Sequence, residues 1–311
     1  MHTIAFLRAQ RHWRMMILTA LALGAMGPWL PALDLERQFW IVLIPVALFG
    51  MSHGGADPLI ITSLKTAHGR STLLFLSGYV ALMALAVAFI LWQPSWALIG
   101  FLWLSVWHFA STDHEFMPDG ASRLAGWLSG SLAIIGPMVG YPDQVATLFG
   151  WLLLREPASL LTVVSVAGKV LLTAWVIGLV IGYRRSPRTA RGRMLVELSV
   201  LASAMILLPP LLAFAFYFCC VHSVRHFLLL MASAQDTQLA FGMQALARHA
   251  APATLGALLL GLLVWLGMRY WQPGGDMAWL ADGVTVVFWG LAVLTVPHSL
   301  MVAWWLRWQR A

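Results

Sequence analysis

Five histidines lie within apolar segments that are long enough to cross a membrane: His53, His108, His222, His226 and His298. An imidazole is costly to hold in hydrocarbon, so such residues usually face a cavity, a partner or a metal ion. His222 and His226 are four residues apart, which places both rings on one face of a helix, about 6 Å apart along its axis. This pair and the three other histidines predict a buried metal centre.

Three of these histidines also have plainer interpretations. The rings of His222 and His226 would equally satisfy hydrogen bonds to neighbouring helices. His53 lies in the sequence SHGGADP at residues 52–58, where two glycines and a proline loosen the helix and let a ligand approach the backbone. The alternative is a simple kink in which the histidine is incidental.

The roles of the remaining two histidines, His108 and His298, have several possible interpretations. His108 lies near the end of its expected helix, so an interfacial histidine competes with a ligand there. His298 follows Pro297 in the last apolar segment. It fits a metal ligand, a group that supports a ligand, or a contact to substrate.

Charged residues within the apolar segments are few. Asp57 lies one helical turn after His53, and Arg225 lies between the paired histidines. We predict that Asp57 and Arg225 form an ion pair, which either orients a ligand imidazole or is purely structural. Glu197 is expected near the cytoplasmic end of its span, without a special role.

The donor types restrict the metal. An all-imidazole site suits iron, zinc, copper or nickel. Zinc peptidase chemistry is disfavoured because the HExxH pattern is absent, and too few histidines lie in spans for a binuclear iron site. Four histidines with open coordination positions therefore favour a mononuclear Fe(II) centre that binds O₂.

The composition indicates a membrane protein. Sixty percent of the 311 residues are hydrophobic and only 10% are charged, which is too little polar surface for a water-soluble protein. Apolar stretches of about 20 residues recur between short charged breaks, as in helical rather than β-barrel membrane proteins. We predict an all-α, polytopic helical bundle in which residues 1–311 form one integral-membrane domain. The net charge of +7 comes from loops between spans and does not indicate nucleic-acid binding.

About ten transmembrane segments are expected, with eight or nine as the alternative. A break at Pro209 and Pro210 separates two of them, whereas one long kinked helix would remove a span. Arg8, Arg11 and Arg14 place the N-terminus in the cytoplasm by the positive-inside rule. In this topology all five histidines lie at similar depth in one leaflet of the cytoplasmic membrane. The expected spans are 14–33, 38–64, 71–93, 95–112, 121–140, 159–183, 194–208, 211–232, 252–271 and 282–308.

Aromatic residues flank the predicted ligands. Trp107 and Phe109 neighbour His108, and Tyr217 and Phe218 precede His222. They are expected to line an apolar tunnel for a hydrophobic substrate, with ordinary helix packing as the alternative.

Several of these motifs together resemble the Brp/Blh family, the multi-spanning β-carotene 15,15′-dioxygenases of bacteria and archaea. The resemblance runs in order from about residue 38 to residue 303, and the His-Ser-x-Arg-His element is its most specific part. It implies iron(II) held by the histidines that map to His53, His108, His222 and His226. The motifs that carry it are SHGGADP at 52–58, WHF at 107–109, FYF at 216–218, HSVRH at 222–226 and VPH at 296–298.

The resemblance implies oxidative cleavage of the central double bond of β-carotene by O₂ to give two molecules of retinal. A substrate dissolved in the bilayer would enter between helices, and a functional link to a retinal-binding opsin is left open. Two other classes remain as alternatives. A membrane haem protein would ligate iron axially with histidines, and a metal or ion transporter would use them as a transit site.

Overall fold

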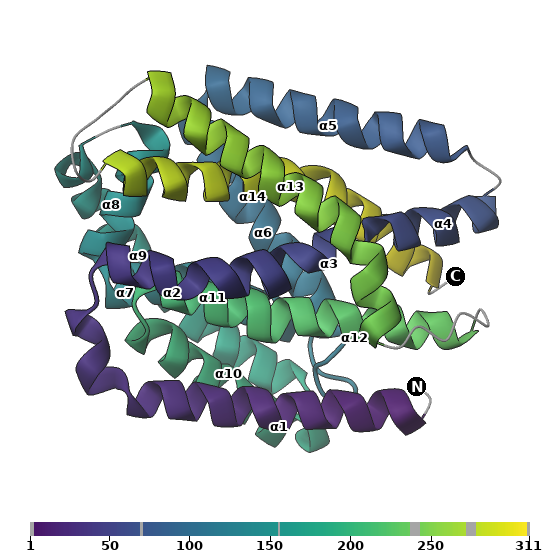
Figure 1. Ribbon diagram of the computed structural model, residues 1–311. Helices are drawn as coiled ribbons and strands as arrows, with labels where there is room; N and C mark the ends of the chain where they lie inside the picture. The colour runs from purple at the N-terminus through teal and green to yellow at the C-terminus, as the bar shows by residue number, and fades with distance from the viewer. Residues whose placement is uncertain (1–2, 69–70, 155, 237–242, 272–277, 310–311) are drawn as a thin grey trace. The chain divides into compact units, whose positions relative to one another are not determined.

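The computed structural model describes residues 3–68, 71–154, 156–236, 243–271 and 278–309 (Figure 1). Throughout these ranges every regular element is a helix, and no strand is formed. The predicted all-α class is therefore confirmed for the described part of the chain.

The chain divides into two compact units that alternate along the sequence. The first comprises Met1–Val46, Val106–Gly150 and Arg155–Ala232, and the second comprises Ala47–Ser105, Trp151–Leu154 and Ser233–Ala311.

The first unit contains most of the helices. Helix α6 (Pro94–His114) enters it at Val106, and the π-helical segment η3 (Phe216–His222) connects two of its helices. The other elements are α1 (Thr3–Ala25), η1 (Gly27–Ala32), α2 (Leu35–Pro45), α7 (Leu124–Gly140), α8 (Pro142–Leu153), α9 (Pro157–Arg185), α10 (Arg188–Leu207), α11 (Pro210–Ala215) and α12 (Ser223–Asp236).

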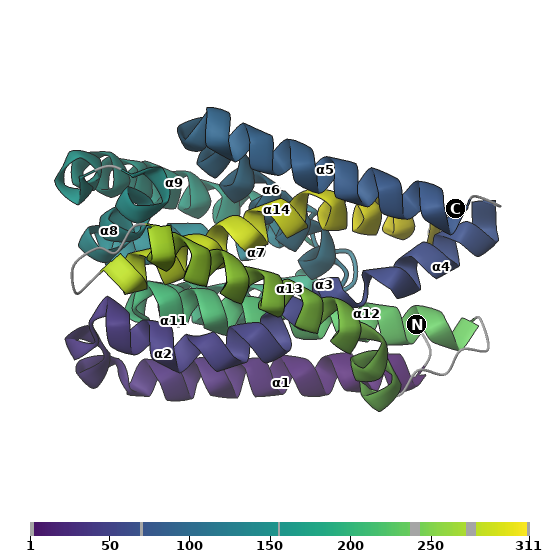
Figure 2. The same cartoon turned by 45° about the horizontal axis from the view of Figure 1, so that its top comes forward.

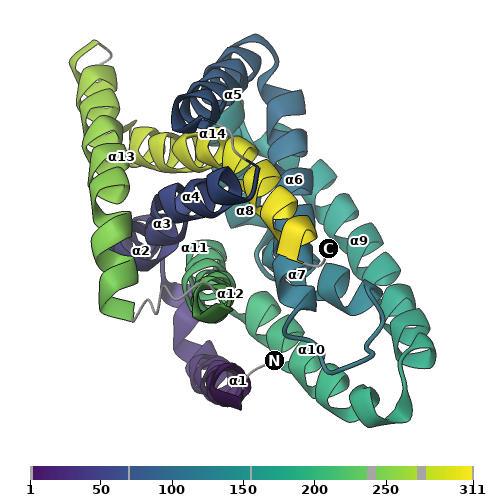
Figure 3. The same cartoon turned by 90° about the vertical axis from the view of Figure 1, so that its right-hand side faces the viewer.

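Glycines allow α7 to pack closely against its neighbours α9 and α10 (Figure 3). A Cβ atom on Gly136 would lie only 2.4 Å from Cβ of Met205 on α10. A Cβ atom on Gly130 would lie 2.8 Å from the backbone nitrogen of Ala110, on the last turns of α6. Small residues at helix contacts are typical of membrane proteins, where packing rather than the hydrophobic effect holds helices together.

The second unit is built around the last two long helices, α13 (Met243–Trp271) and α14 (Ala278–Gln309). Helix α5 (Thr72–Trp92) runs along α14 (Figure 2), and α13 packs on the short helix α3 (Met51–Gly55). Arg269 on α13 pairs with Asp282 on α14 at 3.3 Å. The remaining elements are the π-helical segment η2 (Val46–Gly50) and α4 (Asp57–His68).

The outer faces of several helices are apolar and exposed. Leu85 on α5, Val170 on α9 and Leu263 on α13 are examples. Exposed leucine and valine along a whole helix face is expected where lipid, rather than water, surrounds it. The described helices thus belong to a helical membrane protein.

Six described helical stretches are long and apolar enough to cross a membrane, or seven if α7 and α8, which meet at a 110° bend, form one broken span. They are 35–62, 72–92, 157–185, 210–232, 248–271 and 278–308. The predicted spans 14–33, 95–112 and 194–208 overlap α1, α6 and α10, which are long enough to cross a membrane but too polar to qualify. The expected count of ten is therefore not confirmed. The predicted break at Pro209 and Pro210 is confirmed, because α10 ends at Leu207 and α11 begins at Pro210.

Candidate metal centre

The helical stretches that carry His53 and His222 each contain a short π-helical segment, in which the helix is wider than an α-helix. The segment η3 ends at His222, and η2 ends three residues before His53. Short π-helical segments inside longer helices are often found at functional sites, because the extra residue per turn re-aims the side chains that follow.

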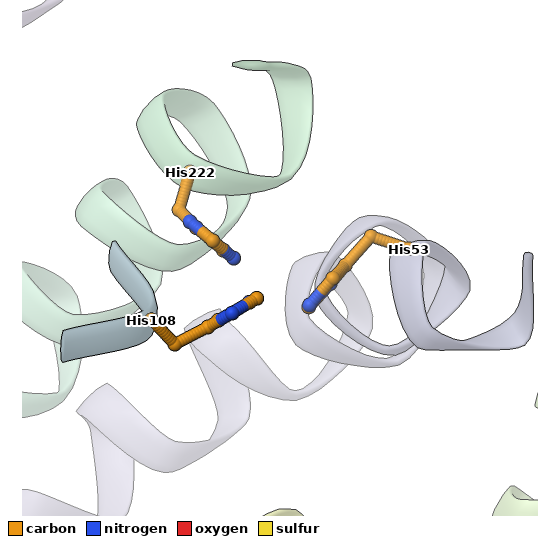
Figure 4. A group of neighbouring side chains, drawn as sticks. All are labelled: His53, His108 and His222. Carbon is orange, nitrogen blue, oxygen red and sulfur yellow. The ribbon is translucent and has the colours of Figure 1, made fainter. Parts of the chain in front are cut away.

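In the first unit, three predicted ligands lie near one another and all are buried. The ring centroids of His108 and His222 are 4.7 Å apart, with planes at 70°. A ring nitrogen of each lies within 4.8 Å of the other, and the two rings point toward each other (Figure 4). His226 follows one turn later, with its ring centroid 6.4 Å from that of His222.

These separations can be compared with those of rings that share one ion. A metal–nitrogen bond of about 2.1 Å puts the ring centroid about 3.2 Å from the metal. Two ligands at angles of about 90 to 110° then have centroids about 4.5 to 5.3 Å apart. His108 and His222 meet this condition. The centroids of His222 and His226 are 6.4 Å apart, which is the largest separation that two ligands of one ion can have and requires them to lie on opposite sides of it. Coordination in adjacent positions therefore requires one of these rings to turn.

Aromatic side chains surround His222. The ring of Phe109 lies 4.5 Å from that of His222 and 5.4 Å from that of Tyr217. Phe218 is parallel to His222 at 6.4 Å, and Trp107 is only half-buried. The tunnel predicted from these four aromatic residues stays a prediction. The packing around His222 is nevertheless apolar and excludes water from the rings of the first unit.

The second unit contains the other two predicted histidines. The ring centroids of His53 and His298 are 5.0 Å apart, at 78°. His53 uses Nδ1 to donate a hydrogen bond to the carbonyl oxygen of Gly50, one turn back. His298 uses Nδ1 to contact Oδ1 of Asp57 at 2.7 Å.

Arg225 has other partners than the sequence predicts. Its Nη1 lies 3.0 Å from Oδ1 of Asp113, and its Nη2 pairs with Oε1 of Glu197. Asp57 instead accepts hydrogen bonds from Tyr79 and His298. The predicted Asp57–Arg225 ion pair is therefore wrong. So is the expectation that Glu197 has no special role, because this carboxylate is buried against a guanidinium.

The Arg225 cluster extends to two hydroxyl groups. Ser129 donates to Oδ2 of Asp113 at 2.7 Å, and Tyr217 donates to the same oxygen. Two carboxylates around one guanidinium formally give this cluster, which lies on the helices next to His108 and His222, one negative charge in excess. Such a charge favours a cation nearby in a low-dielectric interior. The all-imidazole donor set and its surroundings therefore fit a divalent metal ion.

One family description matches most of the chain. The sequence model of the family named β-carotene 15,15′-dioxygenase covers residues 44–306. This chain belongs to that family. The five histidines predicted to lie near the metal all fall within the part of the chain that matches the β-carotene 15,15′-dioxygenase family, whereas the N-terminal arginines lie outside it.

Two curated members of the β-carotene 15,15′-dioxygenase family are similar over most of their length. The chain is 26% identical over 273 residues to the β-carotene 15,15′-dioxygenase of an uncultured marine bacterium, covering 85% of this chain and 92% of the relative. It is 28% identical over 297 residues to the protein named probable β-carotene 15,15′-dioxygenase Blh of Halobacterium salinarum, covering 83% and 81%. No solved structure is significantly similar to this chain.

Sequence reasoning missed Asp113, Ser129 and Tyr79 and gave Glu197 no special role. Asp113 directly follows the predicted span 95–112, yet it is a buried residue of α6. Tyr79 is the one tyrosine of the apolar helix α5, and this was the signal that could have identified it. Glu197 is the only acidic residue of α10, which was the corresponding signal there.

Proposed function

We propose that this protein cleaves the central double bond of β-carotene with O₂ at an Fe(II) centre, giving two molecules of retinal. Membership of the β-carotene 15,15′-dioxygenase family supports the reaction and the substrate. The observation that carries the metal centre is the buried His108–His222 pair, from two different helices, at the spacing expected for ligands of one ion.

The reaction balances without another reactant. The carbon–carbon double bond and the O–O bond break, and two carbonyl bonds form, one on each half of the polyene. No external electron donor is needed. Bound iron would supply the O₂ binding and the electron transfer that a polyene and side chains alone do not provide.

The chain itself would hold the metal and exclude water. His53, His108, His222 and His226 are the proposed ligands, as the family resemblance implies. Phe109, whose ring lies 4.5 Å from that of His222, would contact an apolar polyene. Because these side chains are buried, a bound substrate would be kept from bulk water.

We also propose the membrane arrangement that the arginines indicate. The protein would lie in the cytoplasmic membrane with its N-terminus in the cytoplasm and about ten segments crossing or entering the bilayer. A carotenoid dissolved in the lipid would then reach the site laterally, without passing through water.

Expression in a bacterial host that makes β-carotene tests the reaction. Cells with the intact protein should lose their orange colour and accumulate retinal, measured by chromatography of a solvent extract. Cells with the empty vector and cells with His222→Ala should stay orange. Loss of colour without retinal, or cleavage products of other lengths, would contradict the assignment.

A further inference from the structure

A chain of three polar side chains lies within the apolar second unit. Asp57, in the first turn of α4, accepts a hydrogen bond at Oδ2 from the hydroxyl of Tyr79 on α5, at 2.7 Å. Its other oxygen, Oδ1, lies 2.7 Å from Nδ1 of His298 on α14. Asp57 and His298 are buried and Tyr79 is half-buried. Three helices thus contribute to one fixed orientation of the His298 ring.

The carboxylate determines which ring nitrogen of His298 is basic. Because an ionised carboxylate only accepts hydrogen bonds, Nδ1 of His298 carries the proton and Nε2 carries the lone pair. His53 has the same pattern, since its Nδ1 donates to the carbonyl of Gly50. Metal-bound histidines usually donate the second ring N–H to a carboxylate or a backbone carbonyl, which fixes the ring and raises its basicity.

The spacing of the two rings agrees with this pattern. Their centroids are 5.0 Å apart with planes at 78°. This lies within the range of about 4.5 to 5.3 Å expected for two imidazoles in adjacent positions on one ion. Edge-on packing of two rings occurs at similar distances, so the ligand assignment depends also on the hydrogen bond made by Nδ1 of each ring.

We propose that His298 is a further metal ligand, binding the same ion as His53, and that Asp57 and Tyr79 are its positioning residues. The inference rests on the proposed function, because it adds a fifth imidazole to the four implied by the family. The carboxylate of Asp57 would then place a negative charge beside one of the otherwise neutral ligands, without itself binding the metal. Tyr79 would hold the carboxylate in the rotamer that faces His298.

Cobalt(II) provides a probe that does not depend on catalysis. The full-length protein in detergent is depleted of metal with a chelator and titrated with Co(II), and the visible absorption bands of the bound ion are recorded. His298→Ala should weaken Co(II) binding at least tenfold and change the intensity of these bands, because one nitrogen donor is lost. Added free imidazole should restore the bands of this variant. His249→Ala, at an exposed site on α13, is the matched control and should resemble the parent protein.

Two variants with smaller changes, Asp57→Asn and Tyr79→Phe, test the proposal by Co(II) binding if His298→Ala does not fold. Asp57→Asn retains the shape of the side chain but not its charge, and should weaken Co(II) binding by about 10- to 100-fold. Tyr79→Phe should have a smaller effect in the same direction. Parental affinity in Asp57→Asn would contradict the positioning role of the carboxylate.

The outcome for His298 can be separated from the outcome for the whole centre. His222→Ala serves as the reference for the proposed ligand set. If Co(II) binding is lost in His222→Ala but unchanged in both affinity and spectrum in His298→Ala, the present inference is overturned and the proposed function stands. A raised KM for β-carotene with unchanged Co(II) bands in His298→Ala would show a substrate contact and would likewise overturn it. If His222→Ala binds Co(II) as the parent does, the metal centre itself is wrong.

Discussion

Nη1 of Arg225 lies 3.0 Å from Oδ1 of Asp113, and this ion pair joins the two helices that carry the proposed ligands of the first unit. Asp113 lies on α6 after His108, and Arg225 lies on α12 between His222 and His226. The contact is fully buried, and Glu197 on α10 accepts from the other guanidinium nitrogen. The pair therefore fixes how the ends of α6 and α12 face one another.

Removal of the Asp113 carboxylate should destabilise the protein. Asp113→Ala leaves Arg225 with one buried partner instead of two and removes the acceptor of Ser129 and Tyr217. Breaking a buried ion pair of this kind costs about 3 kcal/mol of unfolding free energy. Unfolding in mixed detergent micelles, followed by circular dichroism, measures the change. The exposed Asp119→Ala is the control and should change stability by less than about 0.5 kcal/mol. Equal stability of the two variants would show that the Arg225 cluster is not a structural support.

A methyl group at Gly130 should disturb the end of α6. The added Cβ would lie 2.8 Å from the nitrogen of Ala110 and 3.0 Å from Cβ of Phe109, next to His108. Because backbone atoms cannot move aside cheaply, we expect Gly130→Ala to cost about 1 to 3 kcal/mol and to weaken metal binding. Gly192→Ala on α10, where no atom lies within 4 Å of the new Cβ, should be tolerated. The measurements are thermal unfolding and Co(II) titration, and parental behaviour of Gly130→Ala would contradict the close contact of α7 with α6.

The features that sequence predicts well here are local ones. The all-α class follows from apolar runs of membrane length, and the break before α11 follows from Pro209 and Pro210, which lack backbone donors. The histidines were identifiable because an imidazole is costly to hold in hydrocarbon and is therefore usually bound to a metal or a polar partner. Each of these arguments uses only neighbouring residues.

Partners far apart in sequence were not predictable in the same way. Asp57 pairs with His298, 241 residues away, and Arg225 pairs with Asp113 and Glu197. Asp57 and Arg225 were predicted to pair because each lies close in sequence to a predicted ligand, but closeness to a ligand does not determine which helices are neighbours. The π-helical segments before His53 and His222 were also missed, because packing by distant helices determines where a helix widens.

Optical and metal analysis should separate the proposed centre from a haem protein. The purified protein should contain about one iron per chain and show no Soret band, because imidazoles rather than a porphyrin hold the metal. Treatment with a chelator should remove the iron and abolish retinal formation, and Fe(II) but not Zn(II) should restore it. A Soret band that disappears in His222→Ala would favour the haem alternative, and energised uptake of metal into vesicles would favour a transporter.

The proposed topology predicts that both chain termini face the cytoplasm. Ten spans, an even number, return the chain to the side on which Arg8, Arg11 and Arg14 lie. Fusion of alkaline phosphatase, which is active only outside the cytoplasm, to either terminus should give an inactive reporter. A fluorescent protein that matures only inside the cell should be active at the same positions. An active phosphatase at the C-terminus alone would indicate an odd number of spans.

Titration of the metal-depleted, full-length protein with Fe(II) tests the central claim most directly, with retinal formed from β-carotene and O₂ as the readout. We predict no retinal without iron, a yield that rises with added Fe(II) and saturates at about one ion per chain, and no response in His108→Ala or His222→Ala. Full retinal formation before iron is added, or an unchanged titration in these two variants, would contradict a catalytic iron held by buried histidines.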